Sequence, residues 1–195
     1  MTSGARRVLD AASALFYDRG IHAVGVDLIA AEAGVTKKTL YDRFGSKEQI
    51  VVEYLAARDE RWQVFLAPYV EGATTPRARI LAVFDAARDW AGAFSTKGCS
   101  MVKAHAEISD PAHPAYQVIA GQKAWMLALF TDLARDVAPR RAAKLGRTLM
   151  LLHEGALVAH GLNVFPDAIG HARDEAATLL RDALRAASAA EEKRR

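Results

Sequence analysis

Hydrophobic residues recur at the spacing of an α-helix along nearly the whole chain. In the first segment, Leu9, Ala12 and Phe16 share one face of a helix that we expect over about residues 6–19. No stretch alternates apolar and polar residues in the manner of a half-buried strand. The pattern therefore predicts an all-α fold of about nine helices.

Prolines, glycines and capping residues divide this pattern into separate helices. Thr36 precedes a short helix as its N-cap, and Ser46 with Gln49 fits a capping box before a longer one. Pro68 should end that longer helix, so we expect residues 69–76 to form a connection. The other predicted helices cover about 26–33, 37–42, 76–94, 101–110, 113–137, 140–164 and 168–189.

The segment from Ile29 to Lys47 has the residue types that a helix-turn-helix requires. Ala30 is small enough for the point where two short helices cross, and Gly34 lies where the chain must turn with a positive φ. Phe44 would close the pair against the first helix. The residues expected to fill the angle between the helices from inside are Ile29, Ala33, Val35 and Leu40.

The outward residues of the second helix in this pair are the ones expected to meet DNA. Lys37 and Lys38 lie near its N-terminus, from which groove-binding helices contact base edges, and lysine can donate to guanine O6 and N7. Phosphates are the expected partners of four other residues: Thr36, Thr39, Tyr41 and Lys47. Two alternatives stay open, namely that Tyr41 packs on the first helix and that Lys38 is an ordinary solvated charge.

Composition narrows the classes of protein that remain. The chain has 195 residues, 51% of them apolar, and a formal net charge of +3, which suits a folded protein with a mildly favourable charge for nucleic acid. Its single cysteine, Cys99, excludes an intramolecular disulfide and fits a reducing compartment. No apolar run is long enough for a membrane span, and none resembles a signal peptide, so we expect a cytoplasmic protein.

With its flanks, this segment resembles the tetracycline-repressor (TetR) family of bacterial regulators. The matching positions run from Phe16 and Gly20, through Val26-Asp27, to Ser46-Lys47-Glu48, within about the first 55 residues. The resemblance implies a homodimer that binds a palindromic DNA operator, with repression as the expected mode and release by a small-molecule inducer. It also implies that the last two helices form the dimer.

Two positions depart from the family pattern. The second helix usually begins after Ser or Thr, whose side chain also touches a phosphate, whereas Gly25 here has no side chain to offer. The residue after Lys37 is often glycine, whereas Lys38 here adds a charge. An operator sequence therefore cannot be transferred from relatives to this chain.

The resemblance divides the chain into a DNA-binding domain, residues 1–47, and a helical domain for ligand binding and dimerisation, residues 48–195. An apolar wall with a few polar groups suits a small-molecule site. The candidates for that wall are Trp62, Phe65, Phe84, Met101, His105, Trp125, Met126 and Phe130. The alternative is that these residues form an ordinary core.

Small residues are frequent in the predicted helix near residues 145–164 and would let another helix approach closely. They are Gly146, Gly155, Ala156, Ala159 and Gly161, and the last predicted helix adds an apolar stripe with Leu180 and Leu184. Two such helices from each of two chains would form a four-helix interface. The alternative is that they pack only within one chain.

The sequence gives little support for an enzyme, so we expect no catalytic residue and no cofactor. His153 and His160 are seven residues apart, roughly 10 Å along a helix, which is too far to share one zinc ion, and we expect no metal site. Cys99, with Lys97 near it, is open to a redox role, but an inert thiol is the simpler interpretation. A DNA-binding regulator without a small-molecule ligand remains an alternative function, and a helical enzyme a more distant one.

Overall fold

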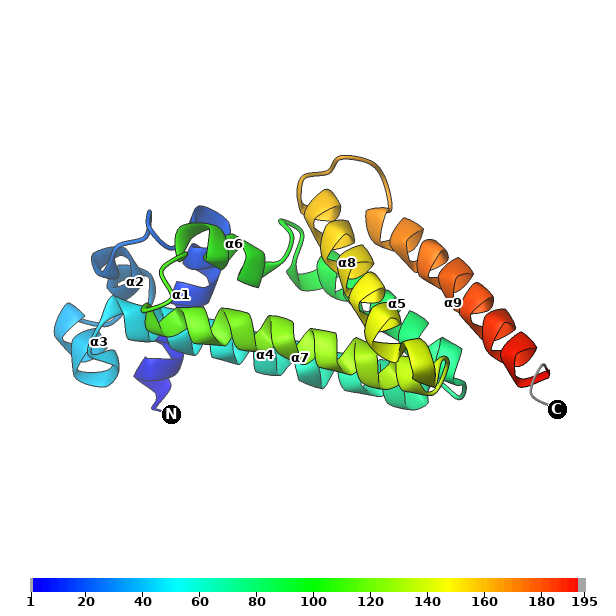
Figure 1. The fold of residues 1–195 in the computed structure, drawn as a ribbon. Coiled ribbons are helices and arrows are strands. Elements are labelled where there is room, and N and C mark those ends of the chain that lie inside the picture. Colours follow the sequence, from blue (N-terminus) through cyan, green and yellow to red (C-terminus); the bar gives the residue numbers. More distant parts are fainter. Residues whose placement is uncertain (1, 193–195) are drawn as a thin grey trace. The chain divides into compact units, whose positions relative to one another are not determined.

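The protein is almost entirely helical, as the hydrophobic pattern predicts (Figure 1). The structure, a computed structural model, describes the backbone of residues 2–192 and the side chains of residues 2–185. Within that range it contains nine α-helices, one short 3-10 helix and no strand. The helices are α1 (Ser3–Arg19), α2 (Val26–Glu32), α3 (Lys37–Phe44), α4 (Lys47–Gly72), α5 (Pro76–Phe94), α6 (Ser100–Glu107), α7 (Pro114–Arg135), η1 (Pro139–Arg141), α8 (Ala142–Gly161) and α9 (Ala168–Glu192).

The chain forms two compact units. Unit 1 comprises Met1–Arg61 and Ser100–Gln122, and unit 2 comprises Trp62–Cys99 and Lys123–Arg195. Helices α4 and α7 therefore contribute residues to both units. We expected a DNA-binding domain to end at Lys47. That division is one of function and differs from the two compact units, so it stays a prediction.

Unit 1 contains the helix-turn-helix. Ile29 and Leu40 are fully buried, and Ala30 is 4% exposed, so small and apolar side chains fill the space between α2 and α3. Gly34 has a φ of +61°, as the turn requires. The amides that follow α2 bond back into it, Gly34 N–H to the Ala31 carbonyl at 3.1 Å and Val35 N–H to the Ala30 carbonyl at 3.0 Å. This arrangement, a Schellman motif, ends α2 and turns the chain into α3.

Unit 2 is built around an apolar core in which α9 packs against α5 and α8. Its largest fully buried side chains come from several helices and include Ile80, Phe84, Met126, Phe130, Leu149 and Leu180. None of the helices in the described part of the chain is both long and apolar enough to cross a membrane.

The predicted N-caps of α3 and α4 are confirmed. The Thr36 hydroxyl accepts the Thr39 amide at 3.1 Å, and the Ser46 hydroxyl accepts the Gln49 amide at 3.1 Å. The Ser46 N–H donates to the Phe44 carbonyl at 2.8 Å. Gly25 precedes α2 without any side-chain cap, as expected.

The prediction that α4 ends near Pro68 is wrong, because α4 continues through this proline to Gly72. A proline inside a helix removes one N–H and crowds the preceding turn. Here the turn after it is held by burial, since Val70 is 8% exposed in the unit 2 core, and by the Tyr69 hydroxyl, which donates to Asp89 at 2.8 Å. Tertiary packing therefore outweighs the local signal.

Several other boundaries differ from the prediction, among them the start of α1 at Ser3 and the end of α8 at Gly161. Helix α3 continues to Phe44, whose side chain is buried, and α6 ends already at Glu107. Asp110 lies in the turn after α6, where its carboxylate accepts the Ala112 amide at 2.9 Å. Helix α8 starts only after the 3-10 turn at Pro139–Arg141.

Candidate nucleic-acid interface

The side chains predicted to meet DNA lie together on the exposed side of α3 and its N-cap. Four of them are exposed at the N-terminal end, namely Thr36, Lys37, Lys38 and Thr39. Tyr41 is 41% exposed although it is a large aromatic side chain. Lys47, in contrast, is only half-exposed at the start of α4.

Both lysines near the start of α3 form ion pairs with acids of their own chain. The Lys37 ammonium is 2.9 Å from a carboxylate oxygen of Asp27 in α2. The hydrogen bond with Asp27, and then its charge, raises the pKa of Lys37 above the ordinary lysine value. The Lys38 ammonium is 2.7 Å from Asp42, one turn further along α3. The cations expected to contact base edges are thus partly neutralised before any DNA arrives.

A third cation of this region is paired as well. Arg43 lies 3.4 Å from Glu53 of α4, and its guanidinium also stacks over the Phe44 ring at 4.9 Å. The spacing of Lys38 and Asp42 signals their pair in the sequence, because residues four apart are neighbours on a helix. Asp27 and Glu53 were missed, since their contacts depend on how α2, α3 and α4 pack.

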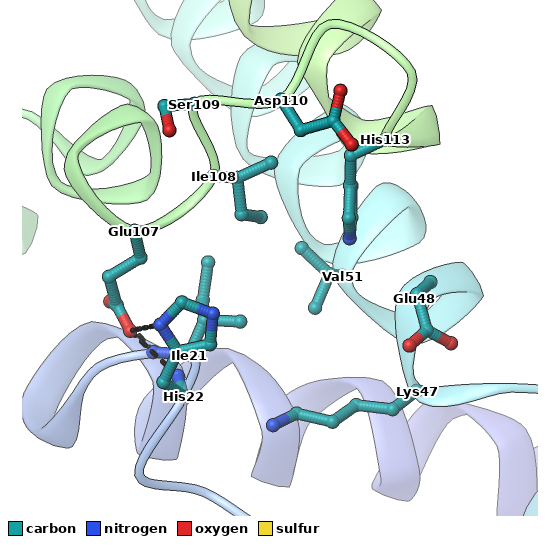
Figure 2. A pocket seen from close by; sticks show the side chains of 10 residues that line it. All are labelled: Ile21, His22, Lys47, Glu48, Val51, Glu107, Ile108, Ser109, Asp110 and His113. Carbon is teal, nitrogen blue, oxygen red and sulfur yellow. Dashed lines mark hydrogen bonds and ion pairs between the residues drawn. The ribbon is translucent and has the colours of Figure 1, made fainter.

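A pocket of about 320 Å³ lies within unit 1, between the turn after α1, the start of α4 and the loop after α6 (Figure 2). Its floor is apolar and its rim is polar. The lining residues are Ile21, His22, Lys47, Glu48, Val51, Glu107, Ile108, Ser109, Asp110 and His113. Lys47 therefore belongs to the wall of a pocket, in contrast to the open position of Lys37 and Lys38.

Helix α6 is tied to the turn between α1 and α2 through the carboxylate of Glu107. This carboxylate accepts the backbone amides of Ile21 at 2.8 Å and His22 at 2.6 Å, and it lies 3.5 Å from Nδ1 of His22 (Figure 2). One turn earlier, the Lys103 ammonium donates to the Tyr17 carbonyl at the end of α1. Unit 1 thus joins α6 to the segment that leads into α2.

Six of the eight residues predicted to line a ligand site belong to unit 2. Trp62, Phe84, Met126 and Phe130 are in its buried core, and Phe65 and Trp125 pack against that core while partly exposed. The other two belong to unit 1. Met101 is buried there, and His105 is exposed, with its ring 5.9 Å from that of Tyr116.

The structure adds His153 to the unit 2 core, a residue that the sequence suggested only as a rejected metal ligand. Its side chain is 5% exposed. Three aromatic rings surround it, with centroid distances of 6.4 Å to Trp62, 5.9 Å to Phe84 and 5.7 Å to Phe130. These neighbours come from α4, α5 and α7, which is why no local sequence pattern identified the cluster.

A chain of polar contacts leads away from His153. Its Nδ1 is 3.3 Å from the carboxylate of Glu154, which in turn lies 2.7 Å from the Lys123 ammonium. Burial alone would raise the pKa of Glu154, but the hydrogen bond with His153 and the charge of Lys123 lower that pKa to about 2. Lys123 also donates to Cys99 Sγ at 3.3 Å. The sequence indicated Lys97 as the cation near this thiol, and it did not indicate Lys123.

The residues that the structure describes contain no group of three or more His, Cys, Asp or Glu side chains arranged to hold a metal ion. Helices α2 and α3, the positive-φ turn at Gly34 and the exposed polar face of α3 define the class of helix-turn-helix DNA-binding proteins.

Comparison with known proteins places the chain more narrowly. Residues 8–54 match the model of the bacterial regulatory proteins of the tetR family. A TetR-family transcriptional regulator from Streptomyces coelicolor is similar over 94% of this chain and 95% of its own, with 30% identity and a TM-score of 0.83. A tetR-type regulator from Streptomyces avermitilis is similar over 94% and 98%, with 32% identity and a TM-score of 0.78. The chain belongs to the TetR family of transcriptional regulators.

A curated relative is also similar to part of the chain. The HTH-type transcriptional activator FasR of Mycolicibacterium smegmatis is 31% identical over 130 residues, which is 67% of this chain. The aligned region spans 58% of the length of that relative.

Proposed function

We propose that this regulator is a homodimeric repressor that binds a palindromic operator in the bacterial cytoplasm and is released by a small-molecule inducer. The exposed polar face of α3 is the observation that supports the DNA-binding part most directly. Two copies of α3 in a dimer would enter successive major grooves, about 34 Å apart or somewhat more, which is why a two-fold symmetric operator is expected.

Each residue of this face has a proposed role. Lys37 and Lys38 contact base edges, most favourably guanine, while Thr36, Thr39, Tyr41 and Lys47 hold phosphates. The exposed ion pairs of the two lysines with Asp27 and Asp42 would open on DNA, because surface pairs of this kind contribute little stability.

Apolar side chains exposed on α8 support dimerisation. Leu151 is 74% exposed and Val158 42%, and with the exposed Gly155 they follow one face of the helix, which Leu162, the C-cap of α8, extends with 71% exposure. Leu184 of α9 is 39% exposed. A second copy of the chain is well suited to cover such a stripe, since monomeric proteins seldom expose large contiguous apolar patches.

Some of the small residues that we assigned to the interface instead make close contacts within unit 2. A side-chain carbon at Gly146 would lie 2.8 Å from the Cα atom of Thr131, and one at Gly161 would lie 2.7 Å from the Cα atom of Gly98. We therefore place the proposed interface on the Gly155 side of α8.

Two features support regulation by a ligand. One is the set of polar contacts from His153 through Glu154 to Lys123 in unit 2, and the other is the hydrogen bonding of Glu107 to the turn after α1 in unit 1. We propose residues 48–195 as the domain for ligand binding and dimerisation, residues 1–47 as the DNA-binding domain, and no cofactor or catalytic role. Met101 and His105 are weaker candidates for ligand contact than the unit 2 residues, because they belong to unit 1. Activation of transcription is a second candidate, favoured by the name of the FasR relative.

The DNA-binding proposal is tested with the double variant Lys37→Ala/Tyr41→Ala. Its affinity for the DNA upstream of its own gene should fall at least tenfold in fluorescence anisotropy titrations, whereas Lys144→Ala, an exposed lysine of α8, should bind normally. Undiminished binding by the double variant would overturn the assignment of α3. A reporter gene behind the same DNA, with and without the regulator, then separates repression from activation.

A further inference from the structure

We propose that Nε2 of His153 accepts a hydrogen bond from the effector, and that the effector is a neutral, largely apolar ring compound carrying a hydroxyl or N–H donor. This inference rests on the proposed function for its regulatory meaning. It starts from one observation, that Nε2 of His153 is buried and has no hydrogen-bond partner among the described residues. Buried polar atoms are almost always paired, so an unpaired one calls for a missing partner.

The role of Nε2 follows from the other nitrogen of the ring. The Lys123 ammonium, 2.7 Å from Glu154, keeps this carboxylate ionised, and a carboxylate only accepts hydrogen bonds. The Nδ1 atom, 3.3 Å from that carboxylate, must therefore be the one that carries hydrogen. In the neutral ring this leaves a lone pair on Nε2, so the missing partner is a donor.

The surroundings of Nε2 define the rest of the ligand. The rings of Trp62, Phe84 and Phe130 enclose the imidazole, and an aromatic or alicyclic body suits such walls. The indole N–H of Trp62 is already donated to the sulfur of Met126 at 3.3 Å. It therefore does not compete for the polar group of the ligand.

The charges near the site favour a neutral ligand. Glu154 and Lys123 compensate each other at 2.7 Å, so this pair leaves no net charge that a charged ligand could balance. Removing an unbalanced charge from water is strongly unfavourable. A phenol or alcohol meets the need for a donor without that penalty.

A ligand at this position would act on several helices at once. Trp62 lies in α4, Phe84 in α5, Phe130 in α7 and His153 in α8. The centroids of the three rings lie 5.7–6.4 Å from that of the His153 ring, which is 5% exposed, so a ligand must separate the rings to reach Nε2. It would thereby favour a conformer in which these helices are displaced, which is the differential affinity that induction needs.

Three probes of nearly equal shape test the hydrogen bond: 4-propylphenol, 4-propylanisole and propylbenzene. The full-length protein should bind the phenol about tenfold more tightly than either of the other two, because only the phenol can donate to Nε2. In His153→Phe the three affinities should lie within about twofold of one another, with that of propylbenzene retained. His153→Gln, which keeps an acceptor, should restore part of the preference.

A second measurement uses the histidine ring of the wild-type protein, so it does not require any variant to fold. Nitrogen NMR of the wild-type protein should show His153 neutral with hydrogen on Nδ1, and its Nε2 resonance should move with the phenol and not with the anisole. Hydrogen on Nε2, equal affinity for all three probes in the wild type, or a preference that survives in His153→Phe would each overturn the proposal.

The same titrations, repeated with operator DNA present, separate this inference from the proposed function. Phenol binding in the expected order with unchanged DNA affinity supports the site at His153 and refutes an inducer role for it. Absence of any phenol preference with intact DNA binding refutes the site and leaves the DNA-binding function standing.

Discussion

The ammonium group of Lys37, the first residue of α3, lies 2.9 Å from Asp27 of α2, so the two helices of the helix-turn-helix share an exposed ion pair. Asp27→Asn should raise the affinity for DNA by about two- to fivefold at low salt, because the carboxylate repels phosphates and competes for Lys37. The gain should be as large on unrelated duplexes as on the operator. Anisotropy titrations over a salt series measure it, with Asp174→Asn, an exposed acid of α9, as the control. Weaker binding by Asp27→Asn would show that the pair instead holds Lys37 in its DNA-contacting position.

Glu107→Ala should lower the free energy of unfolding by about 1–3 kcal/mol, because the amides of Ile21 and His22 lose a charged acceptor. Glu107→Gln keeps one acceptor oxygen and should lose less. Urea unfolding of the full chain measures both variants. Equal stability of Glu107→Ala and the wild type would mean that solvent replaces the carboxylate without loss.

Glu154→Gln should lower the free energy of unfolding by about 2–3 kcal/mol at pH 7, since the pKa of Glu154 is lowered from 4.5 to about 2 in the folded protein. A lowered pKa stabilises the folded state above the unfolded value and ceases to do so as the pH falls through the folded value. The difference between wild type and variant should therefore shrink between about pH 4.5 and pH 2. Urea unfolding at pH 7, 4 and 3 follows it, and a difference that stays constant would contradict the ionised state of Glu154.

Leu151→Glu with Val158→Glu should raise the dissociation constant of the proposed homodimer at least tenfold, because two charges would enter an apolar interface. Light scattering coupled to size exclusion measures the mass. Val64→Glu supplies the matched control, since Val64 is 69% exposed on α4 and lies outside the proposed interface. A double variant that remains dimeric at micromolar concentration would move the interface elsewhere.

Gly146→Ala should destabilise the fold by about 1–3 kcal/mol, because the added carbon would lie 2.5 Å from the Thr131 hydroxyl and 2.8 Å from its Cα atom. Gly121→Ala on α7 is the control, since nothing lies within 4 Å of its added carbon. That second change should be neutral or slightly stabilising, as alanine favours helix. Thermal unfolding compares the two, and equal behaviour would show that α7 and α8 shift apart without strain.

The sequence predicted best those features that depend on neighbours along the chain. Thr36 and Ser46 cap helices through hydroxyls that reach only three residues ahead, so their effect is visible locally. Pro68 gave the wrong helix end for the opposite reason. The burial of Val70 that carries α4 past the proline is a tertiary effect.

The same distinction applies to the candidate sites. The exposed residues of α3 could be listed from the steric pattern of a helix-turn-helix, although their contacts with DNA remain predictions. The ion pair between Lys37 and Asp27 could not be predicted from the sequence, because it depends on the angle between α2 and α3. The aromatic surroundings of His153 were missed because its neighbours come from α4, α5 and α7.

The close approach of Gly98 and Gly161 limits how this protein can evolve. A side-chain carbon at Gly161 would lie 2.7 Å from the Cα atom of Gly98, and one at Gly98 would lie 3.2 Å from that of Gly161. No amino acid is smaller than glycine, so a change at one position has no compensating change at the other. Each of the two positions is therefore restricted to glycine independently, unless the loop before α6 moves away from the end of α8.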